Sequence, residues 1–218
     1  MRYLPQLFAN NRAWATHRIS QNPQFFERLC AIQTPRYLWI GCADSRVPAN
    51  EIVGLDPGEL FVHRNVANIV RADDFNCIAV LQYAIEFIGI TDVIVCGHYG
   101  CGGIQAALGP LVPEPLERWI APIREVRRSR AADIDASVDA AARWRRLCEL
   151  NVIAQVRELS RLQILTSAWT SGRPLAVHGW IYDLHDGLLR DLDVSVTRNE
   201  SQAAELMDRA DGGSVRNI

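Results

Sequence analysis

Lysine is absent from this sequence, and all 23 of its basic residues are arginine. Without a lysine amine, the protein cannot form a Schiff base between a side chain and a carbonyl substrate. With 25 acidic residues the formal net charge is only -2, so binding to nucleic acid or to an anionic membrane surface is not expected. Long apolar runs are also missing, because no stretch reaches the roughly 20 consecutive apolar residues that a spanning helix requires. We therefore predict neither nucleic acid nor a membrane as a partner.

No secretory signal is recognisable in the N-terminal segment, which lacks the apolar core of one. This predicts a cytoplasmic protein. Residues 1–20 do carry arginine and no acid, as an organelle transit peptide does, and that alternative stays open. The same segment has apolar residues at the spacing of an amphipathic helix, namely Leu4, Leu7, Phe8 and Trp14. We predict a helical arm over residues 1–30.

The six cysteines include no C-x-x-C pair and are scattered through a chain too long to need disulfide bonds for stability. This pattern indicates reduced thiols. A redox turn at Cys96 and Cys101, with four residues between them, does not have the usual spacing. Because a free cysteine most often packs as a small hydrophobe, four are predicted to be buried: Cys30, Cys77, Cys96 and Cys148.

Strand and helix patterns alternate along the chain, which has no repeat and no linker rich in glycine and serine. Short apolar runs of the buried parallel type lie at 36–41, 59–64 and 92–97. Between the last two, residues 73–89 have helical periodicity, with Asp73 or Asp74 as the N-cap and Gly89 as the stop. These elements form a predicted βαβ unit.

The second half of the chain begins with a predicted helical region over residues 115–165, broken near Pro122 and again around 129–137. Four arginines of this region are expected on a solvated helix face: Arg124, Arg127, Arg128 and Arg130. Residues 174–195 have the pattern of two strands joined by an Asp-Gly turn.

Together these elements predict an α/β fold in one domain over residues 1–218. The sheet is mainly parallel, with about four parallel strands and an antiparallel C-terminal strand at its edge, and helices flank it. The N-terminal helical arm precedes the sheet, and a loose tail over about 198–218 follows it.

Two predicted strands end at residues that bind soft or borderline metals. The first runs directly into Cys42, and the third runs into His98 and Cys101. In an open α/β sheet ligands collect at the carboxyl ends of the strands, so adjacent placement of these strands would bring the three side chains together. Two thiolates and an imidazole are a catalytic zinc set that leaves one tetrahedral position open.

A phosphate cradle is the main alternative for the glycine-rich turn at 97–103. It would use the backbone N–H groups of Gly100, Gly102 and Gly103 at the start of a helix. This alternative matches no P-loop spacing and gives His98 and Cys101 no task. The zinc interpretation is therefore preferred.

The state of the fourth zinc position depends on the segment CADSR, residues 42–46. Asp44 is close enough to Cys42 to reach the metal, and Arg46 can hold that carboxylate away with a bidentate pair. If Arg46 keeps Asp44, the position takes water; if Asp44 moves onto zinc, the site is closed and merely structural. A helix N-cap with a local salt bridge is the alternative for these two residues.

These segments resemble the signature of the β-class carbonic anhydrases, in particular the bacterial branch. The matching segments are LWIGCADSRVPAN, GELFVHRNVAN, NCIAVLQYAIE, CGHYGCGG and HGWIYDLHDGLLRDLDV, within a similarity from about Asn10 to about Thr197. The resemblance implies reversible hydration of CO2 to bicarbonate and a proton, with one zinc per chain held by Cys42, His98 and Cys101. It also implies that Asp44 and Arg46 form the catalytic dyad.

The resemblance further implies substrate contacts and self-association. Gln33 matches a glutamine that contacts substrate from the neighbouring subunit, so the site would be complete only in a dimer. The family forms dimers and often dimers of dimers. The backbone N–H of Gly102 is a second candidate donor to the developing negative oxygen of CO2.

Some members of this family are inhibited by bicarbonate, which binds a side pocket and stabilises the form with aspartate on zinc. This sequence resembles them in having Trp39, Arg64 and Tyr182 at the matching places. An arginine fork and two aromatic donors suit a small planar anion. A core tryptophan and a structural arginine are the alternatives. With such a pocket, both low pH and high bicarbonate are expected to inhibit.

Two other functions stay open. The same zinc site hydrolyses CS2 or COS in some relatives of this family. A non-catalytic zinc-containing assembly protein, with Asp44 permanently on the metal, is the second alternative, and the intact pair of Asp44 and Arg46 argues against it.

Overall fold

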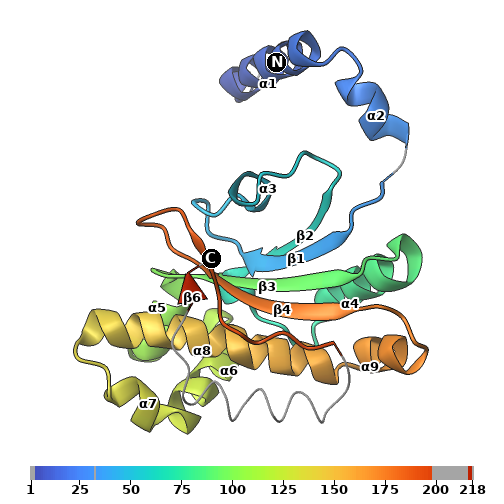
Figure 1. Ribbon diagram of the computed structural model, residues 1–218. Helices are drawn as coiled ribbons and strands as arrows, with labels where there is room; N and C mark the ends of the chain where they lie inside the picture. The colour runs from blue at the N-terminus through green and yellow to red at the C-terminus, as the bar shows by residue number, and fades with distance from the viewer. Residues whose placement is uncertain (1–2, 32, 198–215, 218) are drawn as a thin grey trace. The chain divides into compact units, whose positions relative to one another are not determined.

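The computed structural model describes residues 3–31, 33–197 and 216–217 (Figure 1). Contacts within the chain divide it into two units, Met1–Thr34 and Pro35–Ile218. The larger unit contains the predicted sheet.

The first unit consists of two helices, α1 (Pro5–Gln21) and α2 (Phe25–Ala31). Pro5 suits the start of α1 because the N–H that proline lacks would have no helical partner there. Trp14 of α1 meets Phe25 and Phe26 of α2 edge-on, with ring centroids 6.3 and 5.7 Å apart. The predicted N-terminal helical arm is confirmed.

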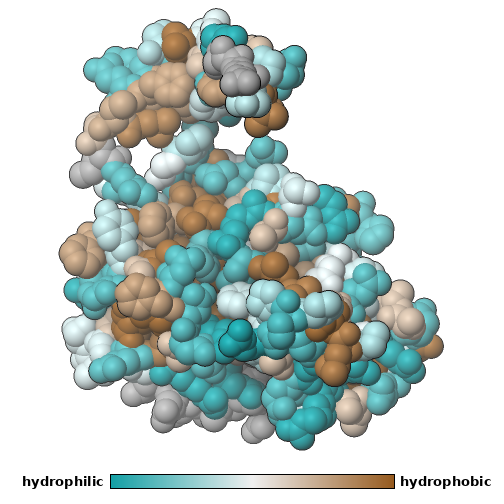
Figure 2. Space-filling view, turned by 180° about the vertical axis from the view of Figure 1, so that it is seen from behind, coloured by the Kyte–Doolittle hydropathy of each residue, from teal (hydrophilic) through white to brown (hydrophobic). Residues whose placement is uncertain are grey.

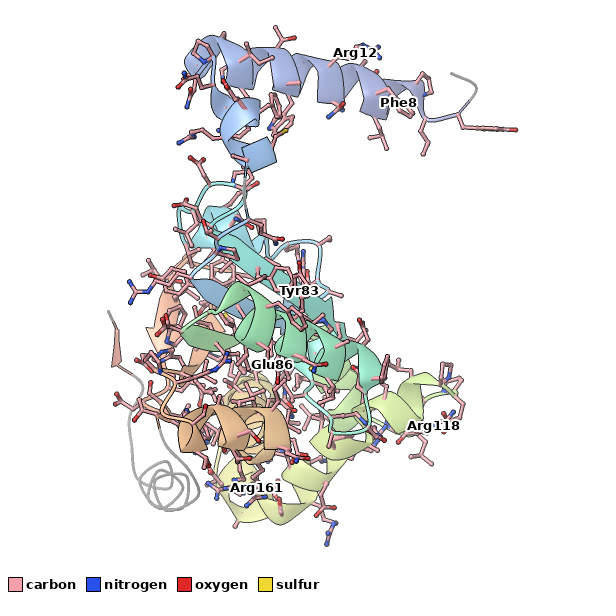
Figure 3. All side chains as sticks on the ribbon, turned by 90° about the vertical axis from the view of Figure 1, so that its right-hand side faces the viewer. Phe8, Arg12, Tyr83, Glu86, Arg118 and Arg161 are labelled. Atoms are coloured by element: carbon pink, nitrogen blue, oxygen red, sulfur yellow. The ribbon has the colours of Figure 1, made fainter. Side chains whose placement is uncertain are left out.

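Apolar side chains gather on the surface of this first unit, as Figure 2 shows. In the part of the chain that the structure describes, α1 buries none of its residues. The exposed apolar residues at or beside α1 are Tyr3, Leu4, Leu7, Phe8, Trp14 and Ile19. Figure 3 labels Phe8 together with the polar Arg12 on this helix. Cys30 of α2 is exposed, so its predicted burial is wrong; this seven-residue helix buries only Phe25.

Among the described residues, the second unit contains one six-stranded sheet with the order β2-β1-β3-β4-β5-β6. The strands are β1 (Tyr37–Cys42), β2 (Leu60–Asn65), β3 (Asp92–His98), β4 (Ala176–Tyr182), β5 (Leu189–Asp191) and β6 (Arg216–Asn217). The first four pair in parallel, and β5 and β6 pair antiparallel. This confirms the predicted mainly parallel sheet with antiparallel pairing at its C-terminal side.

Helical segments connect and cover these strands. They are α3 (Ala49–Ile52), η1 (Val66–Asn68), α4 (Phe75–Gln82), η2 (Tyr83–Ile88), α5 (Gly102–Leu108), α6 (Leu116–Ser129), α7 (Ala131–Asp135), α8 (Ala140–Arg161) and α9 (Gln163–Thr170). Asp74 caps α4 by accepting a hydrogen bond from the N–H of Asn76 at 3.1 Å. Gly89, with φ of 82°, ends the following η2 turn, on which Figure 3 labels Tyr83 and Glu86.

The two faces of the sheet pack differently. Leu38, Val93 and Val177 point into the main core, where they meet apolar residues of α4, η2, α8 and α9. Trp39 and Ile94 lie on the opposite face, in a smaller cluster with α3. Burial on both faces explains why the central strands have continuous apolar sequences. A third cluster surrounds the carboxyl ends of β1 and β3 and includes residues of α5, α6, α7 and α8.

Pro122 lies inside α6, so the predicted break at this proline is wrong. Proline has no N–H, so the carbonyl of Arg118 one turn earlier loses its helical partner. That carbonyl instead accepts a hydrogen bond from Nη1 of Arg71 at 3.2 Å, which satisfies it without ending the helix.

Two of the four arginines predicted to be solvated also have structural roles, although Arg127 is exposed as expected. Nη1 of Arg124 donates to the carbonyl of Ala107 at 3.0 Å. Nη1 of Arg127 donates to that of Leu108 at 2.8 Å. These carbonyls lie at the end of α5, where backbone acceptors lack helical partners, so both arginines cap that helix. Arg128, with 77% of its side chain exposed, does lie on a solvated face.

The predicted C-terminal tail lies outside the described residues apart from β6. Within the described ranges, no helix is long and apolar enough to cross a membrane.

Candidate metal centre

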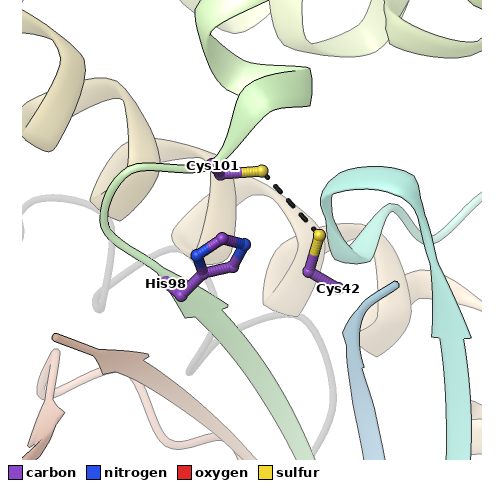
Figure 4. Close-up of side chains that lie close together, drawn as sticks. All are labelled: Cys42, His98 and Cys101. Carbon is purple, nitrogen blue, oxygen red and sulfur yellow. Dashed lines mark hydrogen bonds between the residues drawn. The ribbon is translucent and has the colours of Figure 1, made fainter. Parts of the chain in front are cut away.

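Strand pairing brings together the two segments that carry the predicted metal ligands. Gly41 of β1 lies opposite Cys96 of β3, so both strands end at the same edge of the sheet. The ligand atoms of Cys42, His98 and Cys101 all lie within 4.8 Å of one another, and all three residues are buried (Figure 4). The two sulfur atoms are 3.9 Å apart. The predicted adjacency of these strands is confirmed.

The turn after β3 gives this cluster its shape. His98 is the last residue of β3, and Cys101 is the N-cap of α5. Between them Gly100 has φ of 72°, a conformation that a side chain would strain. The turn therefore returns the chain within three residues, so that the thiol of Cys101 lies near the imidazole of His98.

The donor atoms fit a zinc ion. Nδ1 of His98 donates to the carbonyl of Tyr99 at 3.0 Å, which leaves Nε2 as the lone-pair nitrogen. Nε2 is buried and has no hydrogen-bond partner among the described residues. An unpaired buried nitrogen is costly unless it meets a donor or a metal. With two thiols beside it, this atom completes the soft, borderline donor set that zinc prefers.

The two thiols lie close enough to influence each other's ionisation. Hydrogen bonding from Cys101 lowers the pKa of Cys42. The same contact, together with burial, raises the pKa of Cys101 far above its ordinary value. Ionisation of one thiol of this pair therefore makes ionisation of the other less favourable.

Arg46 holds the carboxylate of Asp44 beside the three candidate metal ligands. Its Nε donates to Oδ1 at 2.9 Å and its Nη2 to Oδ2 at 2.7 Å. These bonds hold the pKa of Asp44 well below its usual range. Oδ2 of Asp44 is also 3.7 Å from Nε2 of His98. The backbone N–H of Arg46 also donates to Oδ1. The alternative of a helix N-cap at Asp44 is wrong, because the next helix is α3 and its N-cap is Pro48.

Known proteins match this arrangement. A sequence profile described as carbonic anhydrase matches residues 37–189. A carbonic anhydrase of Emericella nidulans is 45% identical over 88% of this chain and 86% of its own length. A tetrameric β-carbonic anhydrase of Sordaria macrospora has a similar structure, with a TM-score of 0.84 and 38% identity over 88% of this chain and 97% of its own. The chain belongs to the β-class carbonic anhydrases.

Relatives of this β-class carbonic anhydrase are found beyond fungi. One from Pseudomonas aeruginosa is 36% identical over 87% of this chain and 88% of its own length. A Coccomyxa β-carbonic anhydrase in complex with acetazolamide has a TM-score of 0.87 and 33% identity, covering 98% of this chain and all of its own. Because fungal and algal proteins match alongside a bacterial one, the predicted bacterial branch is not confirmed.

The three residues predicted to bind bicarbonate lie on strands that meet at the metal edge. The strand register places Arg64 opposite Gly41 and Tyr182 opposite His98. The buried Trp39 lies two residues before Gly41 on β1. The guanidinium of Arg64 donates to two backbone carbonyls of residues 42–46, those of Cys42 at 2.8 Å and Asp44. Trp39 and Tyr182 share an apolar cluster. A role in bicarbonate binding stays a prediction.

The two predicted substrate donors lie in different units. Gly102 is the first residue of α5, and a Cβ added there would meet no described atom within 4 Å. Space is therefore open beside its backbone. Gln33 is exposed and belongs to the first unit. Its predicted contact with substrate remains a prediction.

Sequence analysis missed the side chains of α8 that support the ligand segments of this carbonic anhydrase. Nε1 of Trp144 donates to the carbonyl of Cys101 at 3.0 Å. Glu149 accepts a 2.6 Å hydrogen bond from the hydroxyl of Tyr99, whose carbonyl orients His98. Polar residues on the buried stripe of an amphipathic helix are the signal that could have identified them, because such groups need specific partners.

A second group of potential ligands consists of His63, Asp74 and Cys77. Each has a structural explanation. Asp74 caps α4, and Nε2 of His63 faces the side-chain amide of Asn65 at 3.3 Å. Burial raises the pKa of Cys77 to about 12, so this thiol stays protonated as a core residue, as predicted.

Proposed function

We propose that this chain is a zinc enzyme that hydrates CO2 reversibly to bicarbonate, with one metal ion per chain held by Cys42, His98 and Cys101. The unpaired, buried Nε2 of His98, facing two thiols, is the observation that carries this proposal. When bound, a zinc ion acts as a Lewis acid, which lowers the pKa of a coordinated water and so provides a nucleophile near neutral pH.

Asp44 and Arg46 serve as the catalytic dyad in this proposal. The carboxylate of Asp44 is ionised throughout the working range because Arg46 holds its pKa low. It is therefore an acceptor, able to orient a hydroxyl group in the pocket and to receive its proton through a hydrogen bond. Arg46 fixes the position of this carboxylate by donating to both of its oxygens, and each oxygen can still accept a further hydrogen bond.

Gly102 and Gln33 are proposed to bind CO2. Gly102 is the first residue of α5, and its backbone N–H is proposed to donate to the negative charge that develops on a CO2 oxygen, which the helix dipole also favours. The amide of Gln33 is proposed to approach from a neighbouring subunit, so the active unit is a dimer or a dimer of dimers. The tetrameric Sordaria macrospora relative and the exposed apolar residues of α1 support self-association.

Bicarbonate is proposed to inhibit by binding Trp39, Arg64 and Tyr182. Arg64 holds the carbonyls of Cys42 and Asp44, so an anion that takes its guanidinium loosens the loop that carries the dyad. Asp44 then moves toward the metal ligands and closes the site. Activity is expected to rise sigmoidally with pH and to fall with added bicarbonate.

Zinc analysis combined with stopped-flow assays of CO2 hydration from pH 6.5 to 9 tests the proposal. One zinc per chain and rapid hydration at the alkaline end are expected. Parallel assays with CS2 and COS separate the alternative substrates. Zinc-loaded protein that hydrates none of the three at any pH would identify a closed, non-catalytic site instead.

A further inference from the structure

Asn151 is a buried amide on α8, only 1% exposed, that has no place in the ligand set or the dyad. Its Nδ2 donates to the carbonyl of Ala67 at 3.0 Å, and its Oδ1 accepts from Nε2 of Gln155 at 2.9 Å. Oε1 of Gln155 accepts from the N–H of Val70 at 2.8 Å. This chain of hydrogen bonds starts at a backbone donor and ends at a backbone acceptor. The side-chain amides of Asn151 and Gln155 can therefore form all of these bonds in only one orientation.

The residue that Asn151 holds has an unusual backbone conformation. Ala67 has φ of 64° and ψ of 27°, in the left-handed region that residues with a Cβ rarely adopt. Such a conformation persists only where surrounding contacts fix it. Ala67 is fully buried, and the bond from Asn151 fixes its carbonyl.

In this conformation the backbone N–H of Ala67 points at one of the proposed metal ligands. The N–H of Ala67 donates to Sγ of Cys42 at 3.4 Å. An N–H that points at a thiolate stabilises its negative charge and fixes the position of the sulfur. Two thiolates donate more electron density to a metal than neutral histidines do. The hydrogen bond from the Ala67 N–H therefore reduces the electron density that the sulfur of Cys42 donates.

We propose that Asn151 is a positioning residue, which holds Ala67 in its left-handed conformation so that the backbone N–H donates to the sulfur of Cys42. The proposal rests on the assignment of Cys42 as a metal ligand. Asn151 acts through the backbone of η1, since its hydrogen bonds go to Ala67 and Gln155.

The first test needs no metal. Amide hydrogen exchange, measured by NMR on the metal-free protein, reports on the Ala67 N–H directly. Asn151→Leu removes the donor at similar volume and is expected to speed exchange at Ala67 about tenfold or more; Asn151→Ala serves if the leucine variant does not fold. Ser160→Ala, which changes another buried polar residue of α8, is expected to leave this exchange unchanged.

The second test uses zinc and cobalt. Chelator competition is expected to show roughly tenfold weaker zinc binding in Asn151→Leu, within the range for lost supporting contacts. In the cobalt-substituted protein, the sulfur-to-cobalt charge-transfer band is expected to move to longer wavelength, because the thiolate becomes more electron-rich. Glycine adopts positive φ readily, so Ala67→Gly is expected to reduce the effect of Asn151→Leu when the two are combined.

Two results would overturn the proposal. One is unchanged exchange at Ala67 in a folded Asn151 variant. The other is an equal loss of zinc affinity from Asn151→Leu with alanine or with glycine at position 67, which would indicate a general packing role. A wild-type protein that binds no zinc would instead contradict the proposed function, while the exchange experiment would still decide whether Asn151 holds Ala67.

Discussion

The carboxylate of Asp44 lies close both to Arg46 and to the imidazole of His98. Both of its oxygens accept hydrogen bonds from Arg46, while Oδ2 lies 3.7 Å from Nε2 of His98. In the proposed mechanism, a small movement of this carboxylate separates the open form from the closed form. Since Arg46 keeps the pKa of Asp44 far below 6.5, protonation of Asp44 does not explain any loss of activity between pH 9 and 6.5.

Replacing Arg46 with alanine is expected to lower CO2 hydration roughly 100-fold at pH 8.5, the effect typical of losing a positioned acid or base. Without the guanidinium fork, Asp44 is free to move toward His98. Arg46→Lys keeps the charge but not the fork, so we expect only partial activity from it. Arg128→Ala, at an exposed ion pair, is the control that keeps full activity in the stopped-flow assay. An Arg46→Ala variant as fast as the wild type would show that the dyad is not needed.

At the scale of elements, α8 connects the sheet to the metal edge and to α7. Arg146 of α8 donates to both oxygens of Asp133 on α7, at 2.8 and 2.7 Å, and to Glu149 at 3.1 Å. The bonds from Arg146 hold the pKa of Asp133 below its ordinary value of 3.8. Glu149 also accepts from Tyr99, so this network reaches the turn that carries His98.

Arg146→Met is expected to lower the free energy of unfolding by about 2 kcal/mol at pH 7, because charged hydrogen bonds to half-buried carboxylates are lost. A carboxylate with a depressed native pKa contributes its stability above its unfolded pKa and loses it as pH falls through the lower native value. The difference from the wild type should therefore shrink below about pH 3.8. Urea titrations at several pH values measure it, with Arg128→Met as the exposed control. A constant difference at all pH values would mean that packing, not charge, is responsible.

Helices and strands were predictable because their hydrophobic periodicity and their capping and turn residues are local features of the sequence. Asp74 and Gly89 bound the helix between β2 and β3 as expected, and Cys42 and His98 are the last residues of β1 and β3. The continuation of α6 through Pro122 was not predictable, because the compensating donor, Arg71, lies far away in the sequence.

Residues placed by strand ends could be brought together from the sequence, whereas residues placed by distant contacts could not. Cys42, His98 and Cys101 lie at or just beyond the carboxyl ends of paired strands, where a topological rule predicts a site. Asn151 acts through Ala67, 84 residues away, and no local pattern marks that contact. The capping roles of Arg124 and Arg127 also depend on the tertiary placement of α5.

At the scale of the whole molecule, the proposed active unit contains more than one chain. Exposed apolar side chains on a helix indicate a surface that is covered in an assembly. Leu7 and Phe8 of α1 are 59% and 49% exposed. The predicted contribution of Gln33 from a neighbouring subunit gives this assembly a catalytic role.

Leu7→Asp combined with Phe8→Asp is therefore expected to shift the protein toward monomers and to reduce CO2 hydration with it. Sedimentation velocity measures the shift, and chelator competition should show zinc binding unchanged, because the three ligands lie in one chain. Arg12→Glu, on the same helix, is the matched control for added negative charge. An unchanged assembly in the double variant would contradict a role for α1 in association.

X-ray absorption spectroscopy of the zinc-loaded wild type at pH 8.5 tests the central claim most directly, since it measures the atoms around the metal. We expect two sulfur atoms at about 2.3 Å, one imidazole nitrogen at about 2.0 to 2.1 Å and one further light atom. In Cys101→Ser the number of sulfur atoms at this distance should fall from two to one. A wild-type spectrum with no sulfur, or with three sulfurs, would contradict the assignment of Cys42, His98 and Cys101 as the zinc ligands.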